Sequence, residues 1–131
     1  ITDPDKLEKF QYLRGPKRIE RTSGDGHSYI YSEGGMSPYD ELSLPGRTML
    51  TSEGSMNRST HFLYINDRYR LITPVEAERL QDFPDNWTAK KKLADESVVD
   101  VSDRMRMFFM GNALVTEIVK GIGEFISELE D

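Results

Sequence analysis

The sequence has no cysteine, only two histidines and one tryptophan, and no long apolar run. Without cysteine the chain can form no disulfide, no thiolate metal site and no cysteine nucleophile of its own. His27 and His61 do not have the spacing of metal ligands, so no metal site is predicted. No segment approaches the ~20 apolar residues of a membrane-spanning helix and no signal peptide opens the chain, so we expect a cytoplasmic location and no membrane partner.

Basic residues are also in the minority, 17 against 23 acidic ones, which gives a formal net charge of -6. This balance argues against a purely electrostatic affinity for nucleic acid. The early part of the chain is different, because Arg14, Lys17, Arg18 and Arg21 lie close together with Glu20 as the only acid among them. This early basic cluster is consistent either with a solvated face or with a nucleic-acid contact.

What is present in the first half is a β-rich pattern. Residues 1–13 indicate a short lead-in with a helical turn. Alternating side chains and flanking turn residues predict strands at 28–31, 47–51, 61–65 and 68–72, with polar loops at 33–46 and 52–60. The last two strands flank Asn66-Asp67, which predicts a tight hairpin.

The second half is helical. Thr73 and Glu76 form a capping-box pattern, Pro74 suits the first helical position, and Pro84 ends the helix. Glu76 and Arg79 are three residues apart on this helix and are predicted to pair.

The chain then continues through a polar connection at 86–101. Ser102 is placed to cap a short helix at 104–109, and Gly111-Asn112 is predicted to interrupt it. Apolar residues at helical spacing predict a last amphipathic helix over 113–129, with Asn112 at its start.

Two segments resemble conserved blocks of the DNA cytosine-5 methyltransferases. The run Arg70-Leu-Ile-Thr-Pro-Val-Glu-Ala-Glu-Arg-Leu-Gln-Asp-Phe-Pro-Asp resembles the ninth block of that family, and Gly111-Asn-Ala-Leu before an amphipathic helix resembles the tenth. Residues 14–63 resemble, less specifically, the target-recognition region of some bacterial members. Asp82 departs from the family's usual Gly and Leu114 from its usual Val, so we expect a slightly altered helix end and pocket wall.

The resemblance implies an α+β fold: a small twisted β-rich recognition domain, a capped short helix, and a long C-terminal amphipathic helix that belongs with a catalytic α/β domain absent from the sequence. It divides the chain into residues 1–85 (target recognition, ending in the ninth-block helix), 86–110 (polar connection with a short helix) and 111–131 (cofactor-side helix).

The resemblance also implies site residues. Asn112, Ala113 and Leu114 match tenth-block residues that line the S-adenosylmethionine pocket, although a plain helix cap would also explain Asn112. Arg70 matches a residue that contacts the DNA backbone. Thr48 matches one that lies near the flipped-out base, and a shifted alignment would give that role to Thr51. Further candidates for double-stranded DNA are Arg47, Arg58, His61 and Arg18. No catalytic residue is assigned, because the family's Pro-Cys loop, Gly-rich cofactor loop and Glu-Asn-Val strand are absent.

We therefore expect the DNA-recognition portion of a DNA (cytosine-5-)-methyltransferase from a restriction-modification setting, inactive without its catalytic half. The start at Ile1 favours an excised fragment over a natural small subunit of a split enzyme. Two alternatives stay open: a stand-alone DNA-binding module, and a structural helical interaction domain. The apolar stripe of 113–129 predicts self-association or packing against the β-rich region.

Overall fold

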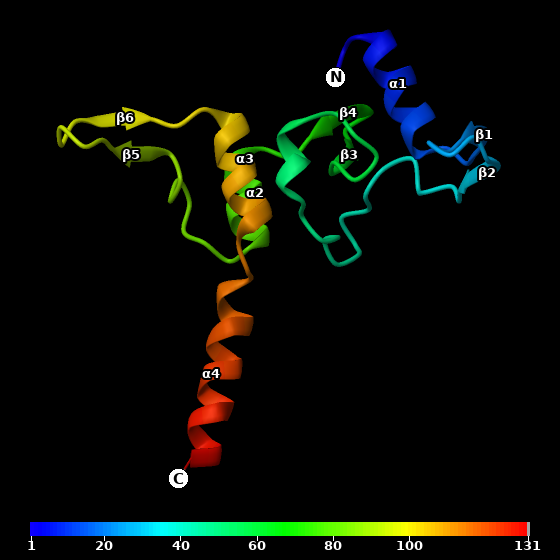
Figure 1. Cartoon of the computed structure of the whole chain (residues 1–131). Helices are drawn as coiled ribbons and strands as arrows, with labels where there is room; N and C mark the ends of the chain where they lie inside the picture. The colour runs from blue at the N-terminus through cyan, green and yellow to red at the C-terminus, as the bar shows by residue number, and fades with distance from the viewer. Residues whose placement is uncertain (131) are drawn as a thin grey trace.

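The structure, a computed structural model, describes residues 1–130. Figure 1 shows an elongated arrangement in which α2 and α3 lie together at the centre and α4 points away from them. The elements in chain order are α1 (Pro4–Arg14), β1 (Lys17–Thr22), β2 (Ser28–Glu33), the 3-10 helix η1 (Thr51–Gly54), β3 (Phe62–Ile65), β4 (Arg68–Leu71), α2 (Pro74–Leu80), β5 (Lys90–Lys92), β6 (Val98–Asp100), α3 (Asp103–Asn112) and α4 (Thr116–Glu130). The α+β class is confirmed.

The strands form three separate antiparallel hairpins, β1–β2, β3–β4 and β5–β6. The hairpin at 61–72 is confirmed, and its turn residues Asn66 and Asp67 both have positive φ, as the tightest hairpin turns require. The third hairpin was not predicted. It forms within the expected polar connection, where Glu96 takes a left-handed conformation at the turn.

The predicted strand at 47–51 is wrong. No strand pairs with this segment in the described chain; it runs extended to Leu50 and then enters η1. Met49 turns its side chain into the core, where it is 6% exposed, while Thr48 and Leu50 stay exposed. The β-like alternation was therefore real, but it reflects packing of a single side chain rather than a sheet.

The main core lies where α2, α3 and the β3–β4 hairpin meet. Its buried members are Met49, Leu63, Ile72, Ala77, Met107 and Met110. Helix α3 packs on both η1 and α2, so the segment at residues 47–54 and the two central helices share one apolar centre. A smaller aromatic stack, in which Phe62 lies between Phe10 and Tyr69, joins α1 to the β3–β4 hairpin.

The start of α2 follows the sequence signals, whereas its end at Leu80 lies before the predicted stop at Pro84. Thr73 and Glu76 form the reciprocal capping box, and Pro74 occupies the first turn. At the other end Asp82 has a φ of 60°, a left-handed conformation that non-glycine residues seldom adopt. The amide of Phe83 bonds back to the carbonyl of Glu78, which closes the helix end.

The predicted break at Gly111-Asn112 is wrong, because both residues form the last turn of α3. A Cβ on Gly111 would lie 2.4 Å from the backbone carbonyl of Leu50, so the glycine permits a close approach of two backbone segments. The break falls instead at residues 113–115, and α4 begins at Thr116 rather than at residue 113.

Helix α4 extends from this break without covering its apolar face (Figure 1). The exposed residues of its stripe are Ile118, Val119, Ile122, Phe125, Ile126 and Leu129. The alternative in which this helix packs back on the β-rich region is therefore not what the structure shows. Within residues 1–130, no helix combines the length and apolar character needed to cross a bilayer.

Candidate functional site

The segment between β2 and β3 is largely irregular, and Asp40 holds it in place. Its carboxylate accepts hydrogen bonds from Arg14 of α1 (2.7 Å), from Arg47 and from the backbone amide of Phe62 (2.8 Å). Burial of Asp40 raises its pKa, but the bonds from Arg47, Phe62 and Arg14 outweigh this and hold the pKa well below the usual range of an aspartate. The loop is therefore fixed by an ionised, partly buried carboxylate.

Arg14 does not belong to an exposed basic face. It is 1% exposed and also donates to the carbonyls of Ser37 and Thr60. The early basic cluster is thus divided by the structure, because Lys17 pairs with Glu33, while Arg18 and Arg21 remain exposed on β1. Only Arg18 and Arg21 are therefore exposed enough to be part of a solvated face or to contact nucleic acid.

The predicted DNA-contacting residue Arg58 is half-buried and bonds to Glu33 at the end of β2 and to the carbonyl of Gly34. Hydrogen bonds from Tyr31, Lys17 and Arg58 lower the pKa of Glu33 to about 2. Arg47, another predicted DNA contact, is occupied by Asp40 and by the carbonyls of Ser59 and Thr60.

His61 lies inside the protein, 2% exposed, beside the equally buried Glu53 of η1. Glu53 accepts a hydrogen bond from the backbone amide of His61 (2.7 Å) and lies 3.1 Å from its Nδ1. The pair ties η1 to the start of β3. This burial leaves His61 no exposed surface for DNA in this arrangement, so a positioning role accounts for it better than base contact.

Arg70 makes a two-point ion pair with Glu76, with both nitrogen–oxygen distances at 2.7 Å. The predicted pairing of Glu76 with Arg79 is wrong, because Arg79 reaches Asp85 beyond the helix end instead. The bonds from Arg70 lower the pKa of Glu76 to about 2, although partial burial acts in the opposite direction. Bonds from Thr73 add to the lowering, so the pair and the helix cap support one another.

We expect Arg70→Met to raise the pKa of Glu76 from about 2 towards its ordinary 4.5, because the variant removes the positive partner of the carboxylate. The stabilisation that depends on this depressed pKa is present above the ordinary value and is lost as the pH falls towards 2. NMR titration of the Glu76 carboxyl carbon measures the change. Arg79→Met serves as the control and should leave that titration nearly unchanged; equal shifts in the two variants would contradict the assignment.

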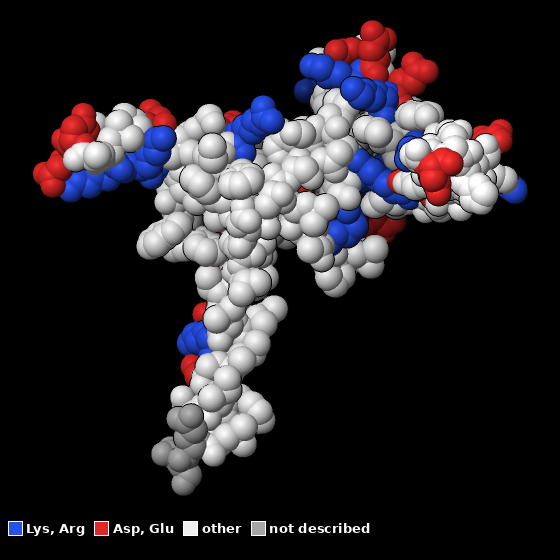
Figure 2. Space-filling view, viewed as in Figure 1, with Lys and Arg blue, Asp and Glu red and all other residues white. Residues whose placement is uncertain are grey.

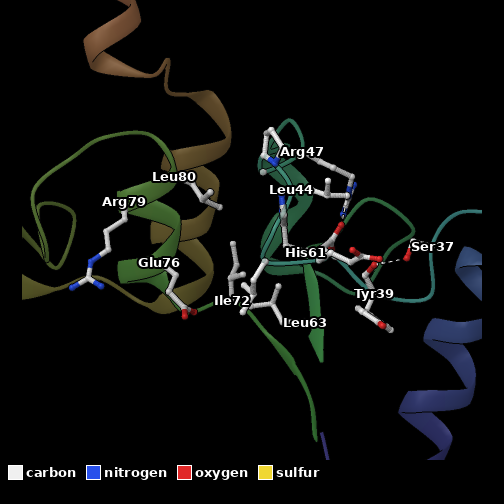
Figure 3. Close-up of a pocket in the computed structure, with 15 residues that line it drawn as sticks. Ser37, Tyr39, Leu44, Arg47, His61, Leu63, Ile72, Glu76, Arg79 and Leu80 are labelled. Atoms are coloured by element: carbon white, nitrogen blue, oxygen red, sulfur yellow. Dashed lines mark hydrogen bonds and ion pairs between the residues drawn. The ribbon is translucent and has the colours of Figure 1, made fainter. Parts of the chain in front are cut away.

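A hollow of about 460 Å³ separates the loop at residues 37–47 from α2. Figure 3 shows Leu44 and Leu80 facing this space from opposite sides, above Leu63 and Ile72, while Arg79 points away from the loop. Its mostly apolar walls are closed by Asp40 and Arg47 on the loop side. The loop is therefore fixed at its base and spans an open space rather than a packed core.

A second cavity, of about 800 Å³, brings together residues that are far apart in the sequence. Arg47 and Thr48 lie on one wall, and Asn112, Ala113 and Leu114 on another. Ile118 and Ile122 of α4 also line this cavity, so the part that α4 contributes is apolar. Of the predicted site residues, Arg18, Arg58, His61 and Arg70 lie outside this cavity.

Asn112 is not the N-cap of the last helix, as the sequence had indicated. It ends α3, and its side-chain amide donates to the carbonyl of Phe108 (3.0 Å). Free amides of a helix start are therefore not presented at 112–114. Instead the exposed Asn112 lines the cavity from the last turn of α3, and Leu114, 71% exposed, lines it from the short non-helical turn at residues 113–115.

Several polar residues that organise the site escaped sequence reasoning. Asp40, Glu53, Glu78, Gln81 and Arg106 are half-buried or buried, and each bonds to a residue outside its own helix or turn. Glu78 and Gln81 both lie in the ninth-block run, but the family pattern specifies a residue only at the position of Gln81. Among residues 1–130, no three His, Asp or Glu side chains gather as a metal site would require.

Comparison with known proteins gives two matches and one negative result. A family model described as C-5 cytosine-specific DNA methylase matches residues 3–128. The Type II methyltransferase M.Sau3AI of Staphylococcus aureus is 54% identical over 126 residues, which cover 96% of this chain and 28% of that protein. The chain thus spans little more than a quarter of the length of this relative. No solved structure matches significantly.

Proposed function

The chain belongs to the C-5 cytosine-specific DNA methylase family, and from this premise we propose that it forms the DNA-recognition portion of a DNA (cytosine-5-)-methyltransferase. The reaction would transfer a methyl group from S-adenosylmethionine to C5 of a cytosine flipped out of duplex DNA. Since the sequence contains no cysteine, the covalent attack on the ring would come from a catalytic portion outside it.

The cavity of about 800 Å³ is the observation that carries this proposal. It joins Thr48, proposed to lie near the flipped base, to Asn112, Ala113 and Leu114, proposed to line the cofactor pocket. The donor methyl and the accepting carbon must meet, so residues serving the two ligands need to face one space.

The residues of the turn suit one wall of a site for S-adenosylmethionine. The exposed Leu114 and the neighbouring Val115 offer apolar contact, and the side-chain oxygen of Asn112 is left for a polar one. The cofactor, when bound, supplies the methyl group. This chain would bind and orient it from one side only, so the remaining contacts would come from the catalytic portion.

DNA would approach the β1–β2 hairpin and the loops before β3. Arg18 and Arg21 are the exposed cations of that hairpin, and Arg70 retains 38% side-chain exposure beside Glu76. Such cations contact phosphates and fix orientation rather than read sequence. Arg47 and Arg58 are already paired with Asp40 and Glu33, and these pairs hold their loops in place. In this proposal both arginines contact DNA only at the edges of those loops.

The catalytic portion would cover the apolar stripe of α4. Figure 2 shows that α4 is largely uncharged on the visible face, in contrast to the charged hairpins. Uncovered apolar surface of this kind is unusual on a monomer and favours association. Without that portion, we expect the chain to self-associate through α4.

A chimera tests the proposed function directly. The chain would replace the matching 126-residue segment of the S. aureus relative, and methyl transfer from S-adenosylmethionine to duplex DNA would be measured. We expect activity from the chimera and none from the relative lacking this segment or from the chain alone. A folded but inactive chimera that still binds DNA would favour the stand-alone DNA-binding module. A folded chimera that shows no salt-dependent DNA binding would favour the structural interaction domain.

In the same chimera, Arg18→Glu should weaken DNA binding about tenfold or more at moderate salt, since a phosphate-facing cation becomes an anion. The slope of affinity against salt concentration should fall at the same time. Lys120→Glu makes the same change of charge on the polar side of α4 and is the matched control. Equal DNA affinity of the two variants would remove the β1–β2 hairpin from the interface.

A further inference from the structure

The turn between α3 and α4 is held from one direction by the end of α2. The side-chain amide of Gln81 donates to the carbonyl of Met110 (2.8 Å) and lies 3.4 Å from that of Ala113. Its own backbone carbonyl accepts from the amide of Thr116, the first residue of α4 (3.1 Å). One residue thus binds both the end of α3 and the start of α4.

These bonds meet a physical need of the turn. The last carbonyls of a helix and the first amides of the next have no partner within their own helices. Here the chain leaves α3 after Asn112 and re-enters a helix at Thr116, and Gln81, only 8% exposed, supplies partners on both sides. The neighbouring Asp82 adds a further bond, since its backbone carbonyl accepts from the hydroxyl of Thr116 (2.7 Å).

The end of α3, just before the turn, is fixed by a backbone contact. Gly111 allows the backbone of Leu50 to approach so closely that even a methyl group would collide with it. Leu50 follows Thr48 and Met49 in the segment at residues 47–54. Residues 112–114 are therefore held by two contacts: the close approach of Gly111 to Leu50, and the bonds from Gln81 at the end of α2.

We propose that Gln81 is a positioning residue for cofactor binding: it holds the turn at 112–114 in the conformation that faces S-adenosylmethionine, without touching the reacting atoms. The proposal rests on the proposed function, because it takes that turn as one wall of the cofactor site. Beyond the proposed function, it states that the affinity for the cofactor depends on the side-chain amide of Gln81, whereas the affinity for DNA does not.

The test is Gln81→Met in the chimera, a change that keeps side-chain length and apolar packing while removing the amide donor. We expect the KM for S-adenosylmethionine and the Kd for S-adenosylhomocysteine to rise about tenfold, the effect of a lost buried hydrogen bond. The turnover number and the Kd for DNA should stay within about twofold, since neither the reacting atoms nor the recognition loops are altered. Gln11→Met, on the exposed side of α1, is the matched control with no expected effect.

An unchanged cofactor KM in Gln81→Met would overturn the proposal, and so would an equal loss of cofactor and DNA affinity, which would indicate a general loss of structure. As a second variant, Gln81→Glu places a carboxylate against two carbonyl oxygens, and a cofactor affinity lower than that of Gln81→Met is expected. A Gln81→Glu variant with normal affinity would count against the role of the amide. The unaltered chimera is measured first, and its failure to bind cofactor would reject the proposed function itself.

Discussion

Replacing Glu78 with glutamine is expected to lower the free energy of unfolding by about 3–5 kcal/mol, the largest effect of any change considered, because it removes one partner of a buried ion pair. Glu78 is fully buried and accepts bonds from Arg106 (3.0 Å), from the amide and hydroxyl of Thr88, and from the amide of Asn86. The variant would leave the buried guanidinium of Arg106 without a counter-charge. Urea denaturation measures the difference.

The effect should depend on pH. Burial raises the pKa of Glu78, but the bonds from Thr88, Arg106 and Asn86 outweigh it, so the net shift is downwards from 4.5. A lowered pKa in the folded state means that the stabilisation is complete above the ordinary value of 4.5 and is lost as the pH falls from there through the lowered value. The gap in stability between the native protein and Glu78→Gln should therefore narrow in acid.

The control is Asp85→Asn, which breaks the exposed pair with Arg79 beside the same helix. Exposed pairs of this kind contribute little to stability, because water and salt screen them. A further variant replaces both Glu78 and Arg106 with methionine, and it should recover much of the lost stability because no charge is left buried alone. A Glu78→Gln variant as stable as Asp85→Asn would show that the buried pair contributes little.

Gly111→Ala is expected to destabilise the protein by about 3 kcal/mol, in the upper part of the range for overpacking. In an ordinary helix interior the same substitution is favourable by about 1 kcal/mol. Here the new Cβ would lie 2.4 Å from three backbone atoms of Leu50 and Thr51, none of which can rotate away. Either α3 or the segment around Leu50 and Thr51 must move.

Gly121→Ala provides the opposite case on α4. Apart from its chain neighbours and the backbone of its own helix, no atom lies within 4 Å of the position that its Cβ would occupy. Only the helix preference remains, and thermal stability should rise slightly. Thermal unfolding followed by circular dichroism measures both variants. A Gly111→Ala protein at least as stable as the native one would mean that the close approach of Leu50 is not required.

Local sequence signals predicted those parts of the fold that local physics controls. The capping box of Thr73 and Glu76 and the Asn66-Asp67 hairpin depend on neighbouring residues, and both are confirmed. The stripe of α4 also follows directly from spacing. These features need no knowledge of what packs against them.

The failures share a different cause, which is contact between distant segments. The sequence pattern predicts a helix break at Gly111, yet packing against Leu50 requires a glycine inside α3. Glu76 pairs with Arg70 of the preceding strand instead of Arg79 on its own helix, because the hairpin places that guanidinium in two-point contact. A pattern of spacings within one element contains neither fact.

The candidate site was predicted in part, and only through family resemblance. Thr48 and Asn112–Leu114 were named from separate matches, and the structure places them on one cavity, although their roles stay predictions. Asp40, Glu78 and Gln81 hold the surrounding segments through buried bonds across the chain. Such residues look like ordinary polar surface in the sequence because burial is decided by the whole fold.

The β5–β6 hairpin has a consequence for how this protein can change in length. Its base is closed by a bond from the amide of Val101 to the carbonyl of Ala89, and its strands bond only to each other. Residues 90–100 could therefore be shortened, lengthened or fused to another sequence while Thr88 and Arg106 kept their places at Glu78. The hairpin is thus a place where insertions are tolerated. It lies between Thr88 and Arg106, whose positions in space are fixed by their buried contacts with Glu78.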